Sequence, residues 1–301
     1  MAQTFNSGIA ARRALDVQTA PPRRRSIRTE RRQQLEAKLA AVQKEYVELH
    51  AALFEAAQVH RRLCAPRLVR DGAFEIASEV FAVRHLPGDF FTVAKTDDGL
   101  ILALGDICGK GLAAGMWTTH LVGLINVHAA VTSEPEAIVR GVNRDTCRMA
   151  SVVPLASLFL AKLDAATGTL DYCSAGHPPA LLLRANGELE LLSEGGLLLG
   201  VVSTAPYSRG SVKLGPGDVL LAYSDGILES LNTAQQEFGY ARLEAQLRRD
   251  RANSAEAMLF SILAAVQDFA ATRPIVDDMS LVIVHREDSA SHSTSFGSIL
   301  H

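Results

Sequence analysis

Apolar residues between positions 28 and 63 recur at alternating steps of four and three, in a segment without glycine or proline. The periodic positions are Leu35, Leu39, Val42, Tyr46, Leu49, Leu53 and Ala56. Such steps place side chains on one face of a helix, as in the a and d positions of a heptad repeat. The pattern predicts a helical linker over residues 28–65. Two interpretations stay open: a dimerising or signal-transmitting coiled coil, which we favour, or a helix packed against its own domain.

The pattern changes after Pro66, where short apolar runs alternate with turn residues. Strands are expected at 74–83, 90–94, 100–107, 155–164, 169–175, 179–185, 189–193, twice within 211–226, and at 279–285. Helices are expected at 112–131, 134–150, 240–248 and 254–271. Hairpins on either side of helical blocks predict an α+β fold, in which helices cover antiparallel sheets.

Composition narrows the class of protein and the limits of its domain. Of the 301 residues, 48% are hydrophobic and 21% are charged, which is typical of a soluble globular chain. We expect a disordered basic arm at 1–27, the helical linker, a catalytic domain at 66–286 and a disordered Ser-rich tail at 287–301.

Charge and cysteine content exclude several classes of partner and compartment. The net charge of −3 gives no field directed at nucleic acid, and the longest apolar stretch, 112–131, is too polar to insert into a membrane. The N-terminus lacks the apolar core of a signal peptide, and the four cysteines are scattered without a zinc-site spacing. We therefore expect a cytoplasmic protein with neither nucleic-acid partner nor membrane insertion.

Aspartates stand where apolar strands meet loops at four places along the chain. Asp89 precedes an aromatic strand, Asp106 ends a strand, Asp225 follows VLLAY, and Asp277 with Asp278 precedes the last strand. Each position alone has a structural explanation, because Asp is common in turns. Four carboxylates that converge would repel one another unless cations lie among them. Two Mn²⁺ or Mg²⁺ ions would balance their charge and activate a water molecule.

Several motifs, taken in order, resemble the PPM-type (type-2C) metal-dependent Ser/Thr phosphatases of the SpoIIE and sigma-factor-regulator branch. They are RHLPGDFF, ALGDICGKGLAAG, LDAATGTLDYCSAGHPPALLL, LGPGDVLLAYSDGILE and DDMSLVIV, within a resemblance that covers residues 55–286. The resemblance implies an αββα sandwich of two antiparallel sheets flanked by helices and preceded by the helical linker.

The resemblance also implies a site for two Mn²⁺ or Mg²⁺ ions. The implied ligands are Asp89, Asp106, the backbone carbonyl of Ile107, Asp225 and Asp277, with Gly88, Asp278 and Gly226 beside them. Asp106 and Asp225 would be catalytic through water activated by the metal ions. Asp277 is preferred to Asp278, because the family's ligand precedes the residue that adjoins the strand.

The chain departs from the family pattern at four positions. Pro87 replaces a glycine and Thr92 replaces a second aspartate near Asp89, whereas Ser280 replaces a threonine. Cys108 stands where eukaryotic relatives have a histidine that is proposed as the general acid. Lys110 is expected either to contact phosphate or to be a solvated turn residue.

The implied activity is hydrolysis of phosphoserine or phosphothreonine on a partner protein. By analogy, the partner is a phosphorylated anti-sigma factor antagonist, a STAS domain, in bacterial partner switching, and the phosphatase is a homodimer joined through residues 28–63. The alternatives are a catalytically weak or silent regulator that acts by protein binding, and another metal hydrolase such as a nuclease. The near-neutral charge argues against the nuclease.

Overall fold

The computed structural model describes residues 23–63, 68–83, 86–149 and 154–288, and the side chains from residue 29 onward. The chain divides into two compact units, Met1–Ala52 and Leu53–His301. Helix α1 (Arg23–Leu63) begins before the expected linker, so residues 23–27 of the expected basic arm are helical. The rest of that arm and most of the expected tail lie outside the described residues.

The heptad face of α1 carries exposed apolar side chains in the first unit. They are Leu35, Leu39, Val42, Tyr46 and Leu49, each about 60% exposed. Exposed ion pairs such as Arg32–Glu36 flank them at i,i+4 spacing. The sequence pattern therefore corresponds to a helix in which apolar and charged side chains alternate along the surface.

The second unit is built on two sheets. The first sheet has the spatial order β1 (Leu68–Asp71), β2 (Phe74–Phe81), β12 (Met279–Arg286), β11 (Val219–Tyr223), β7 (Ala180–Leu183) and β8 (Leu189–Leu192). The second has the order β10 (Gly210–Lys213), β6 (Thr169–Ala175), β5 (Ala156–Asp164), β4 (Gly99–Ile107) and β3 (Phe90–Thr96), and β9 (Gly195–Gly196) pairs with β6. All pairings are antiparallel except that of β9 with β6.

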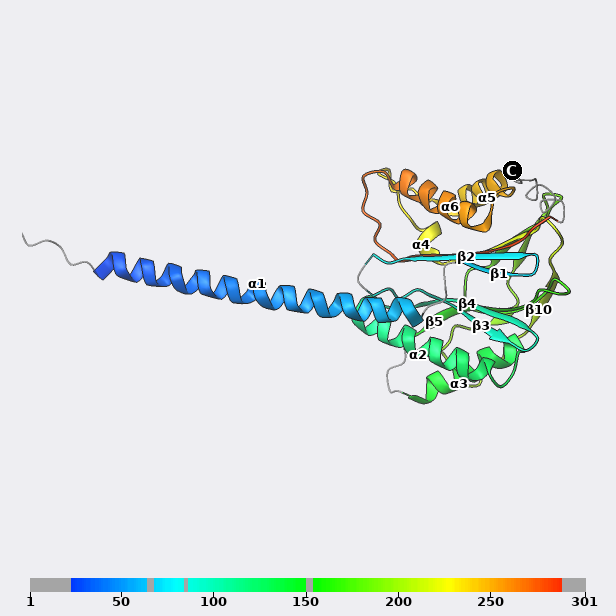
Figure 1. Ribbon diagram of the computed structural model, residues 1–301, viewed down its shortest axis with the longest axis horizontal. Coiled ribbons are helices and arrows are strands. Elements are labelled where there is room, and N and C mark those ends of the chain that lie inside the picture. The colour runs from blue at the N-terminus through cyan, green and yellow to red at the C-terminus, as the bar shows by residue number, and fades with distance from the viewer. Residues whose placement is uncertain (1–22, 64–67, 84–85, 150–153, 289–301) are drawn as a thin grey trace, which may run out of the picture. The chain divides into compact units, whose positions relative to one another are not determined.

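Helices cover the outer face of each sheet (Figure 1). Helices α2 (Leu112–Ala129) and α3 (Pro135–Met149) pack on the second sheet, and α5 (Gly239–Asp250) and α6 (Ala255–Ala270) pack on the first. A single helical turn, α4 (Asp225–Leu228), follows β11. The layers confirm the predicted αββα sandwich.

Strand β12 shows why its sequence is apolar without interruption. Val282 and Val284 belong to the core between the two sheets, whereas Leu281 and Ile283 pack against α5 and α6. Alternate residues of a strand point to opposite faces, and both faces of this strand are covered. Continuous apolar runs in this chain therefore indicate strands with two buried faces.

Two kinds of element were missed by the sequence pattern. Strand β1 and helix α4 have four residues each, and β9 has two. Elements this short contain too few residues for a period to be detected.

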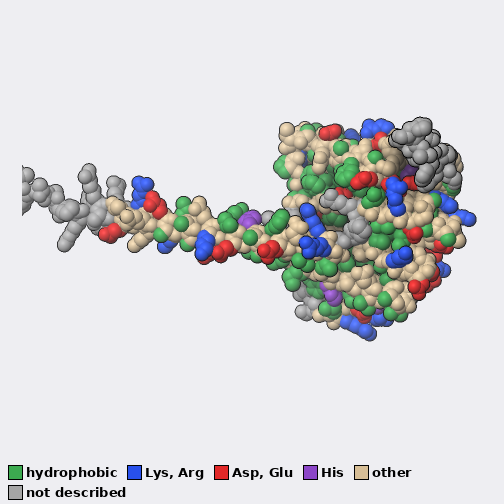
Figure 2. Space-filling model, in the orientation of Figure 1, with side chains coloured by type: hydrophobic (Ala, Val, Ile, Leu, Met, Phe, Trp, Pro, Cys, Tyr) green, Lys and Arg blue, Asp and Glu red, His purple; other side chains and the backbone are tan. Residues whose placement is uncertain are grey.

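Among the described helices, none combines the length and the apolar character needed to cross a membrane. Figure 2 shows acidic and basic side chains interspersed over the visible face of the second unit.

Candidate metal centre

The register of the second sheet places Asp89 beside Asp106. Phe90 of β3 pairs with Gly105 of β4, so the residue before β3 and the next residue of β4 are neighbours at one end of the sheet. Asp89 is 2% exposed. Two carboxylates that are separated in sequence are thus brought together by strand pairing.

The register of the first sheet brings together the other two carboxylates, those of Asp225 and Asp277. Tyr223, the last residue of β11, lies opposite Leu281 of β12. Beyond this pair, the backbone N–H of Ser224 donates to the carbonyl of Ser280 (2.9 Å), and the N–H of Ser280 donates to Oγ of Ser224 (3.0 Å). Asp225, which follows β11, and Asp277, which precedes β12, therefore lie at the same end of the sheet.

The electrostatics show that these two pairs face each other. The pKa of Asp106 is raised to about 6, with burial as the largest cause; a hydrogen bond with Asp89 opposes this rise, and the carboxylates of Asp225, Asp277 and Asp278 contribute to it. Burial, followed by the charge of Asp106, raises the pKa of Asp89 well above its usual range. Packing of one sheet on the other therefore gathers all four predicted carboxylates.

Asp278 has a different environment from its neighbour. Its Oδ1 accepts a hydrogen bond from the N–H of Val83 and its Oδ2 accepts one from the N–H of Gly88, both at 2.8 Å. The carbonyl of Gly88 in turn accepts the hydroxyl of Thr118 (3.2 Å). Both oxygens of Asp278 are thus engaged in holding the loop that carries Asp89, which leaves Asp277 as the residue of the pair available to a metal ion.

Close backbone approach explains the two glycines of the predicted site. A Cβ on Gly88 would lie 3.0 Å from the carbonyl oxygen of Ile107 and 3.3 Å from Oδ1 of Asp106. A Cβ on Gly226 would lie 2.0 Å from the carbonyl oxygen of Asp278, a distance that requires the backbone to move. The carbonyl of Ile107 thus lies on the same side as the Asp106 carboxylate, as expected of a ligand pair.

The donor groups fit a hard divalent cation. Oδ2 of Asp89 is buried and has no hydrogen-bond partner among the described residues. A buried carboxylate without a partner is strongly unfavourable unless a cation compensates its charge. The donors are oxygen atoms alone, the type that Mg²⁺ and Mn²⁺ prefer. Within the described residues, no three acidic, His or Cys side chains already have the geometry of a metal site.

Lys110 makes a contact that the sequence did not predict. Its ammonium lies 2.6 Å from Oδ1 of Asp277 and donates to the carbonyl of Val276 (2.9 Å). Lys110 is an exposed residue of its turn, as one of the two expectations had it, and it also pairs with Asp277. The sequence held no signal for this contact, because the two loops belong to different sheets.

Two other residues near the site, Cys108 and His177, have shifted pKa values. Burial and then the charges of Asp106 and Asp225 raise the pKa of the Cys108 thiol, which disfavours the reactive thiolate. His177 is buried, its Nδ1 lies 2.8 Å from Oγ of Ser157, and burial lowers its pKa to about 3. His177 therefore supports the strand residue opposite Asp106 as a neutral side chain.

A cavity of about 220 Å³ adjoins the carboxylates. Its lining residues are Gly226, Glu229, Ser230, Leu231, Glu237, Ala270, Arg273, Pro274, Ile275, Val276 and Asp277. Burial, followed by the charges of Asp225, Glu237 and Asp277, raises the pKa of Glu229. The cavity offers space next to the site for the residues that flank a reacting group.

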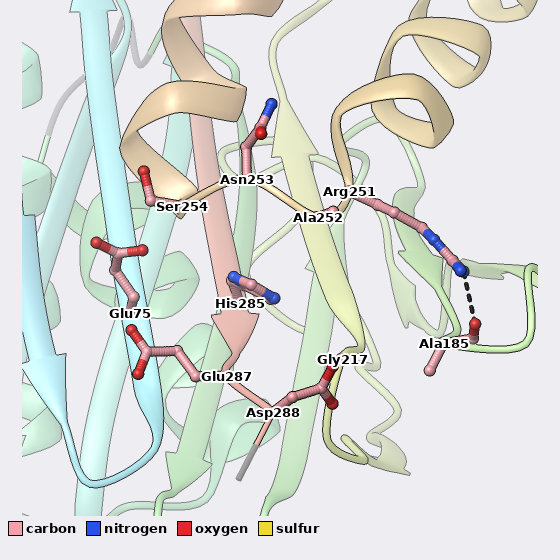
Figure 3. Close-up of a pocket in the computed structure, with 10 residues that line it drawn as sticks. All are labelled: Glu75, Ala185, Gly217, Arg251, Ala252, Asn253, Ser254, His285, Glu287 and Asp288. Carbon is pink, nitrogen blue, oxygen red and sulfur yellow. Dashed lines mark hydrogen bonds between the residues drawn. The ribbon is translucent and has the colours of Figure 1, made fainter. Parts of the chain in front are cut away.

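A second cavity lies at the opposite end of β12, with a volume of about 390 Å³. Figure 3 shows Glu75 from β2, His285 from β12 and the turn before α6 around it. Both oxygens of Glu75 have partners: Arg70 donates to Oε1 (2.8 Å) and the N–H of Ala255 donates to Oε2 (2.7 Å). The buried acid at this end is thus satisfied by the chain itself.

Comparison with known proteins places the chain and its fold in a family. Protein IcfG of Synechocystis sp. is 26% identical over 188 residues, which cover 53% of this chain and 30% of that protein. Phosphoserine phosphatase RsbU of Bacillus subtilis is 22% identical over 247 residues, which cover 80% of this chain and 71% of RsbU. The chain therefore spans less than a third of IcfG but most of RsbU.

Solved structures show the same fold. The SiaA-PP2C domain of Pseudomonas aeruginosa matches with a TM-score of 0.71 and 19% identity, over 83% of this chain and all of that one. The PP2C phosphatase domain of SpoIIE from Bacillus subtilis, solved with a fragment of its regulatory domain, matches with a TM-score of 0.62 and 17% identity, over 73% of this chain and 64% of that one. Residues 96–287, more than half of the chain, match the family of stage II sporulation protein E. The chain belongs to the SpoIIE family, with the PPM-type fold that its motifs predicted.

Proposed function

We propose that this chain is a metal-dependent phosphatase that hydrolyses phosphoserine or phosphothreonine on a partner protein. The observation that carries the proposal is the unpartnered carboxylate oxygen of Asp89, buried against Asp106 where two strand pairs meet. RsbU and RsbP of Bacillus subtilis, both named phosphoserine phosphatases, are relatives of the chain. The site and the relatives support the same chemistry.

The proposed metal ligands are those that the motifs predicted: Asp89, Asp106, the Ile107 carbonyl, Asp225 and Asp277. Two Mn²⁺ or Mg²⁺ ions would supply a hydroxide at neutral pH and offset the charge of the phosphoryl group. RsbX, which shares the fold with a TM-score of 0.55, was solved in complex with magnesium.

The protein residues position these donors. Asp106 neighbours Asp89 and faces Asp225 and Asp277, so it would contribute to holding both ions. Asp278 holds the Gly88 backbone, and Ser224 locks the end of β11 to β12, so Asp89 and Asp225 are each fixed by contacts from β12 or the loop before it. The cavity beside Asp277 then receives the residues that flank the phosphorylated side chain.

For the substrate we propose a phosphorylated anti-sigma factor antagonist with a STAS domain, in a cytoplasmic partner-switching pathway. The support is the relationship to RsbU and RsbP, together with a structural neighbour from the bacterial stressosome, which matches with a TM-score of 0.51. The test is dephosphorylation of candidate STAS proteins by the full chain, compared with equally phosphorylated proteins of unrelated fold. Equal rates on both would contradict the proposed specificity.

We also propose that two copies of the chain associate through residues 28–63. The exposed apolar face of α1 would be buried by the same face of a second copy, as in a coiled coil. Sedimentation of the full chain should show a dimer, and Leu39→Glu together with Leu49→Glu should convert it to a monomer. The control places the same substitutions at Ala40 and Ala51, outside the heptad face. A wild-type monomer at high concentration would contradict dimerisation.

The activity itself is tested by hydrolysis of p-nitrophenyl phosphate and of a phosphoprotein, with Mn²⁺, with Mg²⁺ and with a chelator. We expect turnover with metal ions and none with the chelator. Asp225→Asn should abolish it, whereas Asp97→Asn, the same change in an exposed turn, should not. A folded protein that binds its partner but hydrolyses neither substrate under any condition would favour the silent regulator instead.

A further inference from the structure

Lys110 connects the two halves of the candidate metal centre. It lies in the turn between β4, which carries Asp106, and α2, whereas Asp277 lies in the loop before β12 of the other sheet. The ammonium contacts Oδ1 of Asp277 at 2.6 Å and the carbonyl of Val276 at 2.9 Å. The side chain of Lys110 thus contacts the loop before β12 at two points, the carboxylate of Asp277 and the backbone carbonyl of Val276.

This contact engages one of the two carboxylate oxygens of Asp277, which is a proposed metal ligand. Oδ1 of Asp277 also accepts the N–H of Asp278 at 2.9 Å, so this oxygen already has two donors. An ammonium group can donate hydrogen bonds but cannot accept them, so it has no favourable contact to offer a metal ion. A divalent ion at the same oxygen would meet the repulsion of a second cation within contact distance.

We propose that Lys110 is an internal cation that exchanges with a metal ion at Asp277. The inference rests on the proposed metal-dependent function and deepens it. Asp225 and Asp277 would hold an ion only once the ammonium has left Asp277, so theirs would be the weaker of the two sites. Lys110 is a positioning residue in this scheme, because it acts on the centre through Asp277.

The exchange has a structural consequence for the loop. Release of the ammonium also frees the carbonyl of Val276, whose side chain and backbone lie on the wall of the cavity beside the site. Binding of the weaker ion and the shape of that cavity are therefore coupled through one side chain. The displaced ammonium stays near the centre, since its turn directly follows Ile107 and Cys108.

The test measures Mn²⁺ binding to the full chain by titration calorimetry, independently of turnover. Lys110→Met should tighten the weaker Mn²⁺ site about tenfold, because one competing positive charge is removed. Lys110→Arg, which retains the cation, should bind Mn²⁺ within about twofold of the wild type. Lys95→Met removes the same charge from an exposed strand position and should change neither site.

A second experiment, in the Asp277→Asn variant, tests whether the effect of Lys110 depends on its contact with Asp277. In Asp277→Asn the weaker site should be lost, and adding Lys110→Met should then leave the remaining site unchanged. Unchanged or weaker Mn²⁺ binding in Lys110→Met, with two sites intact in the wild type, would overturn the exchange alone. Absence of Mn²⁺ binding in the wild type would overturn the proposed function as well. Circular dichroism establishes that each variant is folded.

Discussion

Glu75 and Asp89 are both 2% exposed, yet the two carboxylates have opposite surroundings. Glu75, at one end of the sandwich, accepts hydrogen bonds from Arg70 and from the first N–H of α6. Asp89, at the other end, has an oxygen without a partner, and its nearest charged neighbour is another carboxylate, Asp106. The fold thus neutralises a buried acid where the acid is structural and leaves one uncompensated where we propose that metal ions bind.

The comparison teaches that acidity alone does not identify a site. Glu75, Glu287 and Asp288 line the cavity at the Glu75 end (Figure 3). Arg70 forms ion pairs with Glu75 and Glu287, and the N–H of Ala255 donates to Glu75. A buried charge without a partner is costly, so its presence indicates a role that offsets the cost. The predictions below alter one end of this comparison at a time.

The largest effect is expected for Asp106→Asn. Turnover should fall by about a thousandfold or more, because the carboxylate that neighbours Asp89 and faces Asp225 and Asp277 would lose its charge. In chelator, the free energy of unfolding should not fall, since removing one of several repelling carboxylates relieves strain. Steady-state kinetics and urea unfolding measure the two quantities. Retained turnover would contradict the proposed mechanism.

Gly226→Ala should have an intermediate effect. The new Cβ meets the carbonyl of Asp278, so the start of α4 must move away from β12 and carry Asp225 with it. A displacement of this kind should lower turnover by about a hundredfold and weaken Mn²⁺ binding. Gly123→Ala is the control, because a Cβ there meets nothing within 4 Å. Equal turnover in the two variants would show that the close approach is not needed.

Glu75→Gln should affect stability rather than catalysis. The change weakens two charge-assisted hydrogen bonds, so the free energy of unfolding should fall by about 2 kcal/mol. Turnover per folded molecule should stay the same, since Glu75 lies beside the end of β12 that is farther from the candidate metal centre. Asp89→Asn should give the reverse result in chelator: no loss of stability, but loss of activity once metal ions are added. If Glu75→Gln and Asp89→Asn had the same effects on stability and on activity, the proposed difference between the two ends of the sandwich would be wrong.

At neutral pH the smallest effect is expected for His177, whose contribution to stability depends on pH. Burial lowers its pKa to about 3 in the folded protein, whereas the unfolded side chain titrates near 6.5. The unfolded chain therefore binds the extra proton, and stability is retained above pH 6.5 and lost below it, by at most about 1.4 kcal/mol per pH unit. His177→Gln should flatten this slope in urea unfolding between pH 6.5 and 4. The control is His50→Gln on α1, and an unchanged slope in His177→Gln would show that another group dominates.

The sequence was sufficient for elements and residues whose signals are local. The apolar runs of β4 and β12, and the turn residues around them, identified the strands and placed an aspartate at the end of each. The family motifs then implied that these aspartates meet. Helix α1 was recognised from its heptad period, although its first residues were assigned to the arm because PPRRR carries no apolar period.

Only the tertiary structure decided how neighbouring acids divide their roles. The sequence gives Asp277 and Asp278 the same chemistry, but Asp278 is engaged by the N–H of Gly88, 190 residues away in the chain. The contact of Lys110 with Asp277 was likewise decided by the packing of one sheet on the other. Periodicity and turn chemistry are properties of adjacent residues and can be read along the chain, whereas a hydrogen bond between distant loops exists only once the sheets have packed.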